Sequence, residues 1–428
     1  MKRIESSLWV KVALLTLAAL FAGCGKSSSN FSSTNVSNQT KLPAMPFDGR
    51  NPAIAVAGTD LYVLQGGPRD GMKMVPNRAA FFDSEKNQWK ELPPLTEVLD
   101  MAVGRWTGKE FQVAGYVCQE PLPNPQTYEN QCPRIIPTIS VYNPIRRKWS
   151  SKSILHDLFP DKSDLTDLPA DTGTKSTSIV GSYQDTTYFA VSGKEFGLRG
   201  DSSISVLPKM VTAMGGNSCQ AGSMLMNIGV PESSYDADAF VMDTSPHGRL
   251  PRFNQLVMQG IDLAKTPLTV EQLDMPEKKV LQSGGNNIDS ERIVPVCTSE
   301  SVVLLSPNFG AVFVWDAVSQ IWNSGKHEAP AIPPDLPFDR LALADVFVDQ
   351  LITYQEQPEG MPLLIRYNPL TNELTRHALS LKTVNGQTPA HADAIVPIDG
   401  KVLVYQDLPG SSADEFTLLP LAVTDPRS

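Results

Sequence analysis

The sequence predicts an all-β protein made of repeated antiparallel sheets, and three observations lead to this prediction. The 428 residues include 35 Pro and 29 Gly, which is enough to separate many short elements and disfavours long helices. A stretch that runs from an aromatic residue through a polar turn to a large apolar residue occurs four times with the same spacing. Short apolar runs also recur at a period of about 50 residues, which is typical of repeat architectures.

The first 23 residues predict a secretory signal. Basic residues at Lys2, Arg3 and Lys11 accompany an apolar stretch over residues 12–21. That stretch is only about half of the ~20 residues that a membrane-spanning helix requires. Small residues then lead to Cys24, so we expect residues 1–23 to be removed on export.

The end of this signal resembles the lipobox of bacterial lipoproteins, in which the cysteine is lipidated and begins the mature chain. The residues concerned are Phe21, Ala22, Gly23 and Cys24. The resemblance implies a lipid anchor on Cys24. In a Gram-negative host it also implies an outer-membrane location, on the periplasmic side or the cell surface, because Gly25 and not aspartate follows the cysteine. An ordinary cleaved signal is the alternative.

Residues 24–45 predict a flexible tether, and residues 46–428 a folded body. The tether is rich in Ser and Asn and contains few large apolar side chains. Such a segment cannot bury enough surface to offset the entropy of ordering it. We therefore expect the lipid to hold one end of the tether and the folded body to occupy the other.

The four repeated stretches predict β-hairpins. In each, the residue after the first aromatic is Asp or Asn, whose side chain can accept a hydrogen bond from the backbone of the turn. The large residue on the returning strand can fill space between neighbouring sheets. The paired positions, seven residues apart, are Phe82 and Trp89, Tyr142 and Trp149, Trp315 and Trp322, and Tyr367 and Leu374.

Apolar strands upstream of the hairpins form a second signal. They start near residues 60, 109, 302, 349 and 400, and consecutive starts are 49, 47 and 51 residues apart. The first ends in the glycine pair Gly66 and Gly67. Similar pairs stand at Gly215 and Gly216 and at Gly284 and Gly285. The long middle segment has room for about four such units by this period.

An apolar strand, a glycine pair, an aromatic and a tryptophan seven residues on are together similar to the kelch repeat. The resemblance implies a β-propeller of four-stranded blades over roughly residues 50–425, like the central domain of galactose oxidase. We expect seven blades, with six or eight as alternatives, and an irregular β-sandwich array as the competing fold. In kelch propellers a strand from one terminus completes the last blade, and the segment near residue 55 is the expected partner of the C-terminal strand.

Four cysteines remain after the anchor residue, and an even number in an exported protein favours disulfides. Three pairings are possible. We prefer Cys118 with Cys132, which leaves Cys219 with Cys297, and free buried thiols are the alternative.

Several classes of function are disfavoured. The formal net charge is −10 and no basic run exceeds three residues, so we expect no nucleic-acid partner. We also expect no metal and no other cofactor. No cysteine and histidine cluster has zinc spacing, the acidic stretch over 156–171 lacks the alternation of a calcium loop, and no tyrosine directly precedes a histidine as a copper site of the galactose oxidase type would suggest.

Function is expected to reside in loops on the two faces of the propeller. Arg69, Asp70 and Arg78 follow the first glycine pair and are candidate ligand-binding residues, although exposed loop charges without a role are the simpler interpretation. No catalytic residue is identified. The prediction is a monomeric, lipid-anchored module that binds a protein or a glycan. The alternative is a carbohydrate-acting enzyme similar to a sialic-acid mutarotase or epimerase.

Overall fold

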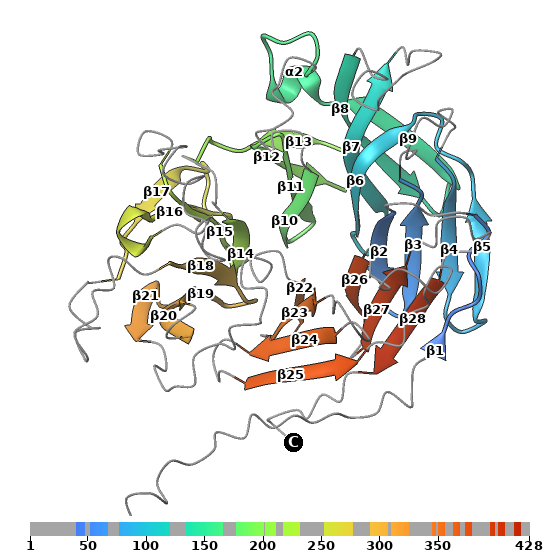
Figure 1. Cartoon of the computed structure of the whole chain (residues 1–428). Helices are drawn as coiled ribbons and strands as arrows, with labels where there is room; N and C mark the ends of the chain where they lie inside the picture. The colour runs from blue at the N-terminus through green and yellow to red at the C-terminus, as the bar shows by residue number, and fades with distance from the viewer. Residues whose placement is uncertain are drawn as a thin grey trace, which may run out of the picture. The chain divides into compact units, whose positions relative to one another are not determined.

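The protein is a seven-bladed β-propeller with almost no helix (Figure 1). Seven four-stranded antiparallel sheets form the blades, which confirms the predicted fold class and blade number. The computed structural model describes residues 40–47, 52–66, 77–119, 134–165, 177–200, 202–210, 217–231, 252–276, 292–306, 310–324, 345–347, 350–355, 363–368, 373–378, 394–398, 401–406 and 415–420.

Blades 1 to 4 each use four consecutive strands, and the described residues of this region include two short helical turns. Blade 1 contains β2 (Ala53–Ala57), β3 (Asp60–Leu64), β4 (Ala79–Asp83) and β5 (Gln88–Leu92). Blade 2 contains β6 (Leu99–Trp106), β7 (Phe111–Gln119), β8 (Arg134–Asn143) and β9 (Lys148–Ser153), followed by α2 (Leu155–Leu158). Blade 3 contains β10 (Thr177–Tyr183), β11 (Thr186–Val191), β12 (Lys194–Arg199) and β13 (Ile204–Val206). Blade 4 contains β14 (Asn217–Ala221), β15 (Met224–Gly229), β16 (Val257–Asp262) and β17 (Val270–Leu273), with η4 (Phe253–Gln255) before β16.

Blades 5 and 6 follow the same plan, whereas blade 7 combines both ends of the chain. Blade 5 contains β18 (Val294–Cys297), β19 (Ser301–Ser306), β20 (Gly310–Asp316) and β21 (Ile321–Ser324). Blade 6 contains β22 (Asp345–Phe347), β23 (Gln350–Gln355), β24 (Leu363–Asn368) and β25 (Glu373–Ala378). Blade 7 contains β26 (Ala394–Ile398), β27 (Lys401–Gln406), β28 (Glu415–Pro420) and β1 (Thr40–Lys41).

The first strand of each blade is the inner strand. Contacts between first strands run from β2 to β6, from β6 to β10, from β10 to β14, from β14 to β18 and from β22 to β26. Hydrophobic clusters fill the spaces between successive blades, beginning at the junction of blades 7 and 1 and ending at the junction of blades 5 and 6. Because successive side chains of a strand point to opposite faces of the sheet, one strand packs against both neighbouring blades. In β3, Leu61 and Val63 pack toward blade 7, whereas Tyr62 and Leu64 pack toward blade 2.

The four repeated stretches are hairpins between the third and fourth strands, as predicted. In each, the two residues seven apart are direct cross-strand partners: Phe82 with Trp89, Tyr142 with Trp149, Trp315 with Trp322, and Tyr367 with Leu374. In each blade two large side chains therefore lie opposite each other on neighbouring strands. The seven-residue spacing recurs because the same hairpin register places these two residues opposite each other in all four blades.

The turn chemistry also agrees with the prediction. Asn143 Oδ1 accepts a hydrogen bond from the backbone N–H of Arg146 at 2.9 Å, and Asp83 and Asp316 accept equivalent bonds from their own turns. The residue two before the returning tryptophan has a positive φ in all three of these turns, at Asn87, Arg147 and Gln320. The polar side chain thus replaces a backbone acceptor while the chain reverses.

The tryptophans of the fourth strands join neighbouring blades by hydrogen bonds. Trp89 Nε1 donates to the carbonyl of Pro43 at 2.8 Å, Trp149 Nε1 to that of Pro93 at 2.8 Å, and Trp322 Nε1 to that of Asp274 at 2.6 Å. Each acceptor follows the outer strand of the preceding blade within two residues. The tryptophan therefore both fills space and holds adjacent outer strands together.

A strand from the N-terminal side completes blade 7, but it is not the segment that was expected. Thr40 and Lys41 of β1 pair with Leu418 and Thr417 of β28. The segment near residue 55 is instead β2, the inner strand of blade 1, which pairs with β3. Because β1 lies within residues 24–45, the C-terminal part of the predicted tether belongs to the propeller.

The middle of the chain contains the two blades that a total of seven requires. The segment between the second strands β7 and β19 contains two further second strands, β11 and β15, although by the repeat period it has room for about four units. Blade connections and insertions there are long: residues 230–256 separate β15 from β16. The later glycine pairs lie outside the described residues and precede the inner strands β14 and β18, so they do not correspond to Gly66 and Gly67, which follow β3.

Removal of β1 should destabilise the propeller. A chain that begins at residue 46 lacks β1, the Pro43 acceptor of Trp89 and the buried side chain of Met45. Burial of a methionine alone contributes about 1.5–3 kcal/mol, so we expect a loss of at least that size relative to a chain that begins at residue 39. Urea denaturation of the two purified chains measures the difference. Equal midpoints would show that blade 7 is stable with three strands.

None of the helices in the described ranges has the length and apolarity needed to cross a bilayer.

Candidate functional site

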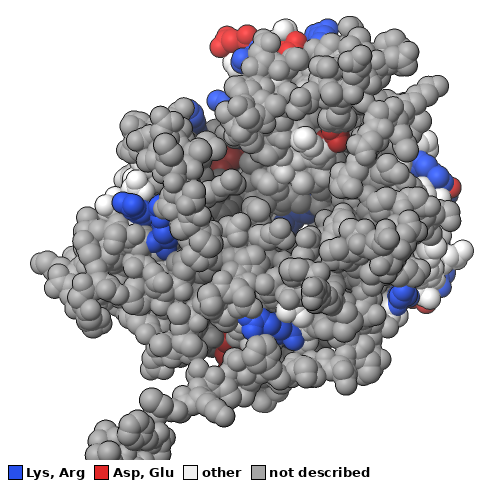
Figure 2. Space-filling view, viewed as in Figure 1, with Lys and Arg blue, Asp and Glu red and all other residues white. Residues whose placement is uncertain are grey.

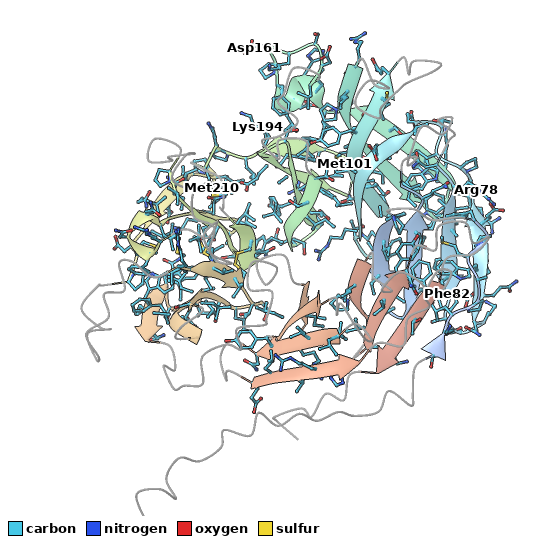
Figure 3. All side chains as sticks on the ribbon, in the orientation of Figure 1. Arg78, Phe82, Met101, Asp161, Lys194 and Met210 are labelled. Carbon is cyan, nitrogen blue, oxygen red and sulfur yellow. A yellow bond between two sulfur atoms is a disulfide. The ribbon has the colours of Figure 1, made fainter. Side chains whose placement is uncertain are left out.

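Of the three residues predicted to bind ligand, the structure describes Arg78, while Arg69 and Asp70 lie outside the described residues. Arg78 precedes β4 and lies near β4 and β5 at the outer part of blade 1 (Figure 3). Its Nε donates to Glu91 Oε1 at 2.9 Å, and its guanidinium carbon lies 5.0 Å from the centre of the Phe47 ring. These contacts give Arg78 a role in packing the edge of blade 1, and its predicted ligand-binding role gains no support from them.

The disulfide between Cys219 and Cys297 confirms the preferred pairing of these two cysteines. Cys219 lies on β14 and Cys297 on β18, so the bond joins the inner strands of blades 4 and 5, with Cα atoms 6.0 Å apart. Cys118 on β7 is also disulfide-bonded. Cys132, its predicted partner, lies outside the described residues, as does the predicted lipidation site Cys24.

A polar cluster lies on the inner strands of blades 2, 3 and 4, and we call Arg105, Ser182 and Gln220 the inner-edge cluster. Arg105 on β6 donates from Nη2 to Ser182 Oγ on β10 at 2.5 Å. Gln220 on β14 donates from Nε2 to the Ser182 carbonyl at 2.8 Å and accepts from the Ser182 N–H at 2.5 Å. Three blades are thus connected through the C-terminal ends of their inner strands.

These hydrogen bonds show that the cluster faces the inner edge of the blade. One edge of β10 pairs with β11, and the edge that remains is the one toward the other inner strands. The backbone N–H and carbonyl of Ser182 on that edge bond to the amide of Gln220, which replaces a missing neighbouring strand. The same amide also donates to the Gly222 carbonyl at 2.7 Å. Gln220 is therefore fixed by three hydrogen bonds.

Gly181 allows the Gln220 side chain to lie against β10. A Cβ added at residue 181 would lie 2.7 Å from Gln220 Cβ and even closer to its Oε1. The register of β10 against β11 also shifts between Ile179 and Gly181, which is a β-bulge. Glycine and bulge together bring two side chains and one backbone edge into contact, as bulges near functional sites often do.

An acidic residue, Asp100, lies near the other end of β6. It is partly buried, and burial raises the pKa of its carboxyl, against a smaller opposing effect of the Met101 N–H that donates to it. Met101 has a φ of 48° and is 47% exposed, and the ladder between β6 and β7 shifts register here. Figure 3 labels Met101 on β6. Asp100 and Arg105 are five residues apart, on the order of 15 Å along a strand, too far to act on one atom.

Replacement of Asp100 by asparagine should stabilise the protein at neutral pH. Because the folded pKa is raised, the native state keeps a proton that the unfolded chain loses above about pH 3.9. Wild-type stability should therefore fall as the pH rises through the raised pKa, and Asp100→Asn should lack this decrease while still accepting the Met101 hydrogen bond. Urea midpoints between pH 4 and pH 8 measure this. Asp157→Asn, which removes an ion pair with Lys152, should not gain stability; a gain in both variants would contradict the explanation.

Charges on the described surface are mixed. Figure 2 shows Lys and Arg beside Asp and Glu around the visible face, with no large area of one sign among the described residues. Within the same residues no group of three or more His, Cys, Asp or Glu side chains could hold a metal ion.

The inner-edge cluster was not predicted from the sequence. Its members come from three blades and are far apart in the chain, and blades 3 and 4 lack the seven-residue spacing from an aromatic to a large residue that identifies blades 1, 2, 5 and 6. One available signal was Gly181 within an apolar strand pattern, because an isolated glycine there suggests a bulge or a close approach.

Comparison with known proteins gives no family. No protein-family model matches the chain, and no curated protein matches it. Among solved structures, a streptogramin B lyase structure aligns with 89% of this chain and 97% of its own, at 11% sequence identity and a TM-score of 0.39. A similarity of this size carries no argument about chemistry, and the kelch relationship stays a prediction.

Proposed function

We propose that the protein is a lipid-anchored binding module of the outer membrane, in which the propeller presents a protein- or glycan-binding surface. The disulfide between Cys219 and Cys297 carries the proposal, because such bonds persist in exported proteins and are rare in the cytosol. The predicted signal, the predicted lipobox and this disulfide are all consistent with a location outside the cytosol.

The place of β1 supports the role of the predicted tether. The tether passes directly into the outer strand of blade 7, so the anchored end of the chain joins a folded sheet. About 15 residues between the anchor and β1 span at most ~50 Å when fully extended. The propeller would therefore stay close to the membrane surface, with its loops available to a partner.

Lipidation is tested with the full chain in the native host. Mass spectrometry of the purified protein should find a diacylglyceryl group on Cys24, and Cys24→Ser should abolish it and leave the protein in the aqueous phase after detergent partition. Gly25→Asp is the matched control, since it should keep the lipid but move a Gram-negative lipoprotein to the inner membrane. An unmodified Cys24 in the wild type would refute anchoring.

Binding is tested separately, by crosslinking intact cells and by a glycan array probed with the full chain in detergent. A saturable partner that excess unlabelled protein displaces is the expected result. The absence of any saturable partner in both experiments would refute the binding role.

A carbohydrate-acting enzyme is the second candidate, and one observation favours it. Asp100 lies partly buried on an inner strand, and burial raises the pKa of its carboxyl, which is the direction of change that favours a general acid. Its distance along β6 from Arg105 argues against a shared reacting atom. Turnover of a sugar anomer or epimer that is lost in Asp100→Asn would support this candidate over the binding module.

A further inference from the structure

Arg105 has an unusual environment for a cation. It is partly buried on the inner strand β6, and burial lowers the pKa of its guanidinium. Among the described residues its hydrogen-bond partner is the neutral hydroxyl of Ser182, and no carboxylate lies within 4.0 Å of it. Arg78, Arg134 and Arg199, in contrast, each pair with an acid.

The hydrogen bond to Ser182 uses only part of the donor capacity of this guanidinium. A guanidinium carries five N–H donors, and a partly buried charge is most favourable when it is paired and hydrogen-bonded. Within the described residues the other Arg105 donors meet no protein acceptor, and none of its nitrogens is a buried atom without a partner, so they are open to solvent and to a ligand. A bound anion would provide both the missing charge and the missing acceptors.

The surroundings hold the site in a fixed geometry. The backbone N–H and carbonyl of Ser182 both bond to the Gln220 amide, which is also held by the Gly222 carbonyl, so the hydroxyl that orients Arg105 belongs to a fixed edge. Gly181 leaves the space that this arrangement needs. Because the groups around Arg105 are already fixed, less conformational entropy is lost when a ligand binds. This favours a specific site here over one at a mobile surface arginine.

We propose that the inner-edge cluster binds the carboxylate of a small acidic sugar, with Arg105 as the residue that holds it. The proposal rests on the proposed binding function and names its ligand chemistry. A planar guanidinium can donate two parallel hydrogen bonds to a carboxylate, which a neutral sugar hydroxyl cannot accept in the same way, and comparison with inorganic phosphate distinguishes the two anions that this geometry fits. The Ser182 hydroxyl can donate to or accept from an adjacent sugar hydroxyl.

The test compares galacturonate with galactose, which differ by the carboxylate, using the full chain in detergent and calorimetric titration. Galacturonate should bind and galactose should not. Arg105→Met should weaken galacturonate binding by at least about tenfold, and Arg105→Lys should recover part of it, because lysine keeps the charge and loses the two-pronged geometry. Arg78→Met, which removes an arginine at the edge of blade 1, is the matched control and should leave the affinity unchanged.

A second measurement avoids variants that fail to fold. Phenylglyoxal modifies accessible guanidinium groups, and peptide mapping of the wild-type chain should show that galacturonate protects Arg105 while galactose does not. Arg78 should be modified equally in both cases.

Three results would overturn the proposal. They are galacturonate binding that Arg105→Met leaves intact, an Arg105 that galacturonate fails to protect, and Arg105-dependent binding of inorganic phosphate without binding of galacturonate. Neutral glycans that still bind, or a partner found by crosslinking, would show that the binding function survives the loss of this site.

Discussion

Trp89→Ala should lower the free energy of unfolding by about 3–5 kcal/mol, the range for removing a large aromatic from a core. The Trp89 side chain is buried, and its ring centre lies 5.0 Å from that of Phe82 and 5.3 Å from that of Phe416. It therefore contacts blade 1 and blade 7 at once. Its indole N–H also bonds to Pro43, next to β1. Urea denaturation followed by fluorescence and by circular dichroism measures the effect.

Trp89→Phe separates the hydrogen bond from the packing. This variant keeps an aromatic ring but leaves the Pro43 carbonyl without its donor, and we expect a loss of about 1–3 kcal/mol. Trp149→Phe removes the corresponding bond to Pro93 between blades 1 and 2 and is the matched control. Similar losses in both would show that the bond acts in the same way at these two blade junctions. A loss below 1 kcal/mol for Trp89→Ala would contradict the assigned role.

Cys219→Ala with Cys297→Ala should cost about 2–4 kcal/mol. The bond closes a loop with a sequence separation of 78 residues, and its loss gives the unfolded chain more freedom. Both residues also lie at the hydrophobic cluster between blades 4 and 5, so alanine is a better replacement than serine. Differential scanning calorimetry of the double variant and the wild type measures the change.

The single variants provide the control for this prediction. If the bond itself stabilises the fold, Cys219→Ala alone should lose most of the stability, and adding Cys297→Ala should change little, because the bond is already absent. Two single losses that simply add in the double variant would instead attribute the effect to side-chain packing.

The sequence predicts the hairpins because their constraint is local. Asp or Asn, a turn and a tryptophan lie within eight residues, so their spacing is visible along the chain. Blades 3 and 4 form the same pairing without those residues: Leu198 pairs with Ile204, and Ile261 with Val270. Leu198 and Ile261 are fully buried, which shows that aliphatic side chains also fill the space between blades. Their hairpins therefore carry no distinctive pattern.

The inner-edge cluster is invisible in the sequence for the opposite reason. Arg105, Ser182 and Gln220 meet only after three blades have formed, and each is an ordinary polar residue in its own strand. The charges considered from the sequence, including Arg78, follow a conspicuous glycine pair, but Arg78 belongs to the edge of blade 1. Local patterns identify strands and turns, whereas contacts between inner strands depend on the ring.

The pairing of β1 with β28 has a consequence for the order of events during synthesis. The strand that completes blade 7 is made before the other strands of the propeller, and its partner β28 is made after them. Pairing of such distant segments is slow because a large loop must close. Until then the outer edge of β28 is open, and an open edge can pair with another chain. A product that stops before residue 415 would leave β1 without its partner, and we expect such fragments to aggregate or to be degraded rather than to accumulate as shorter propellers.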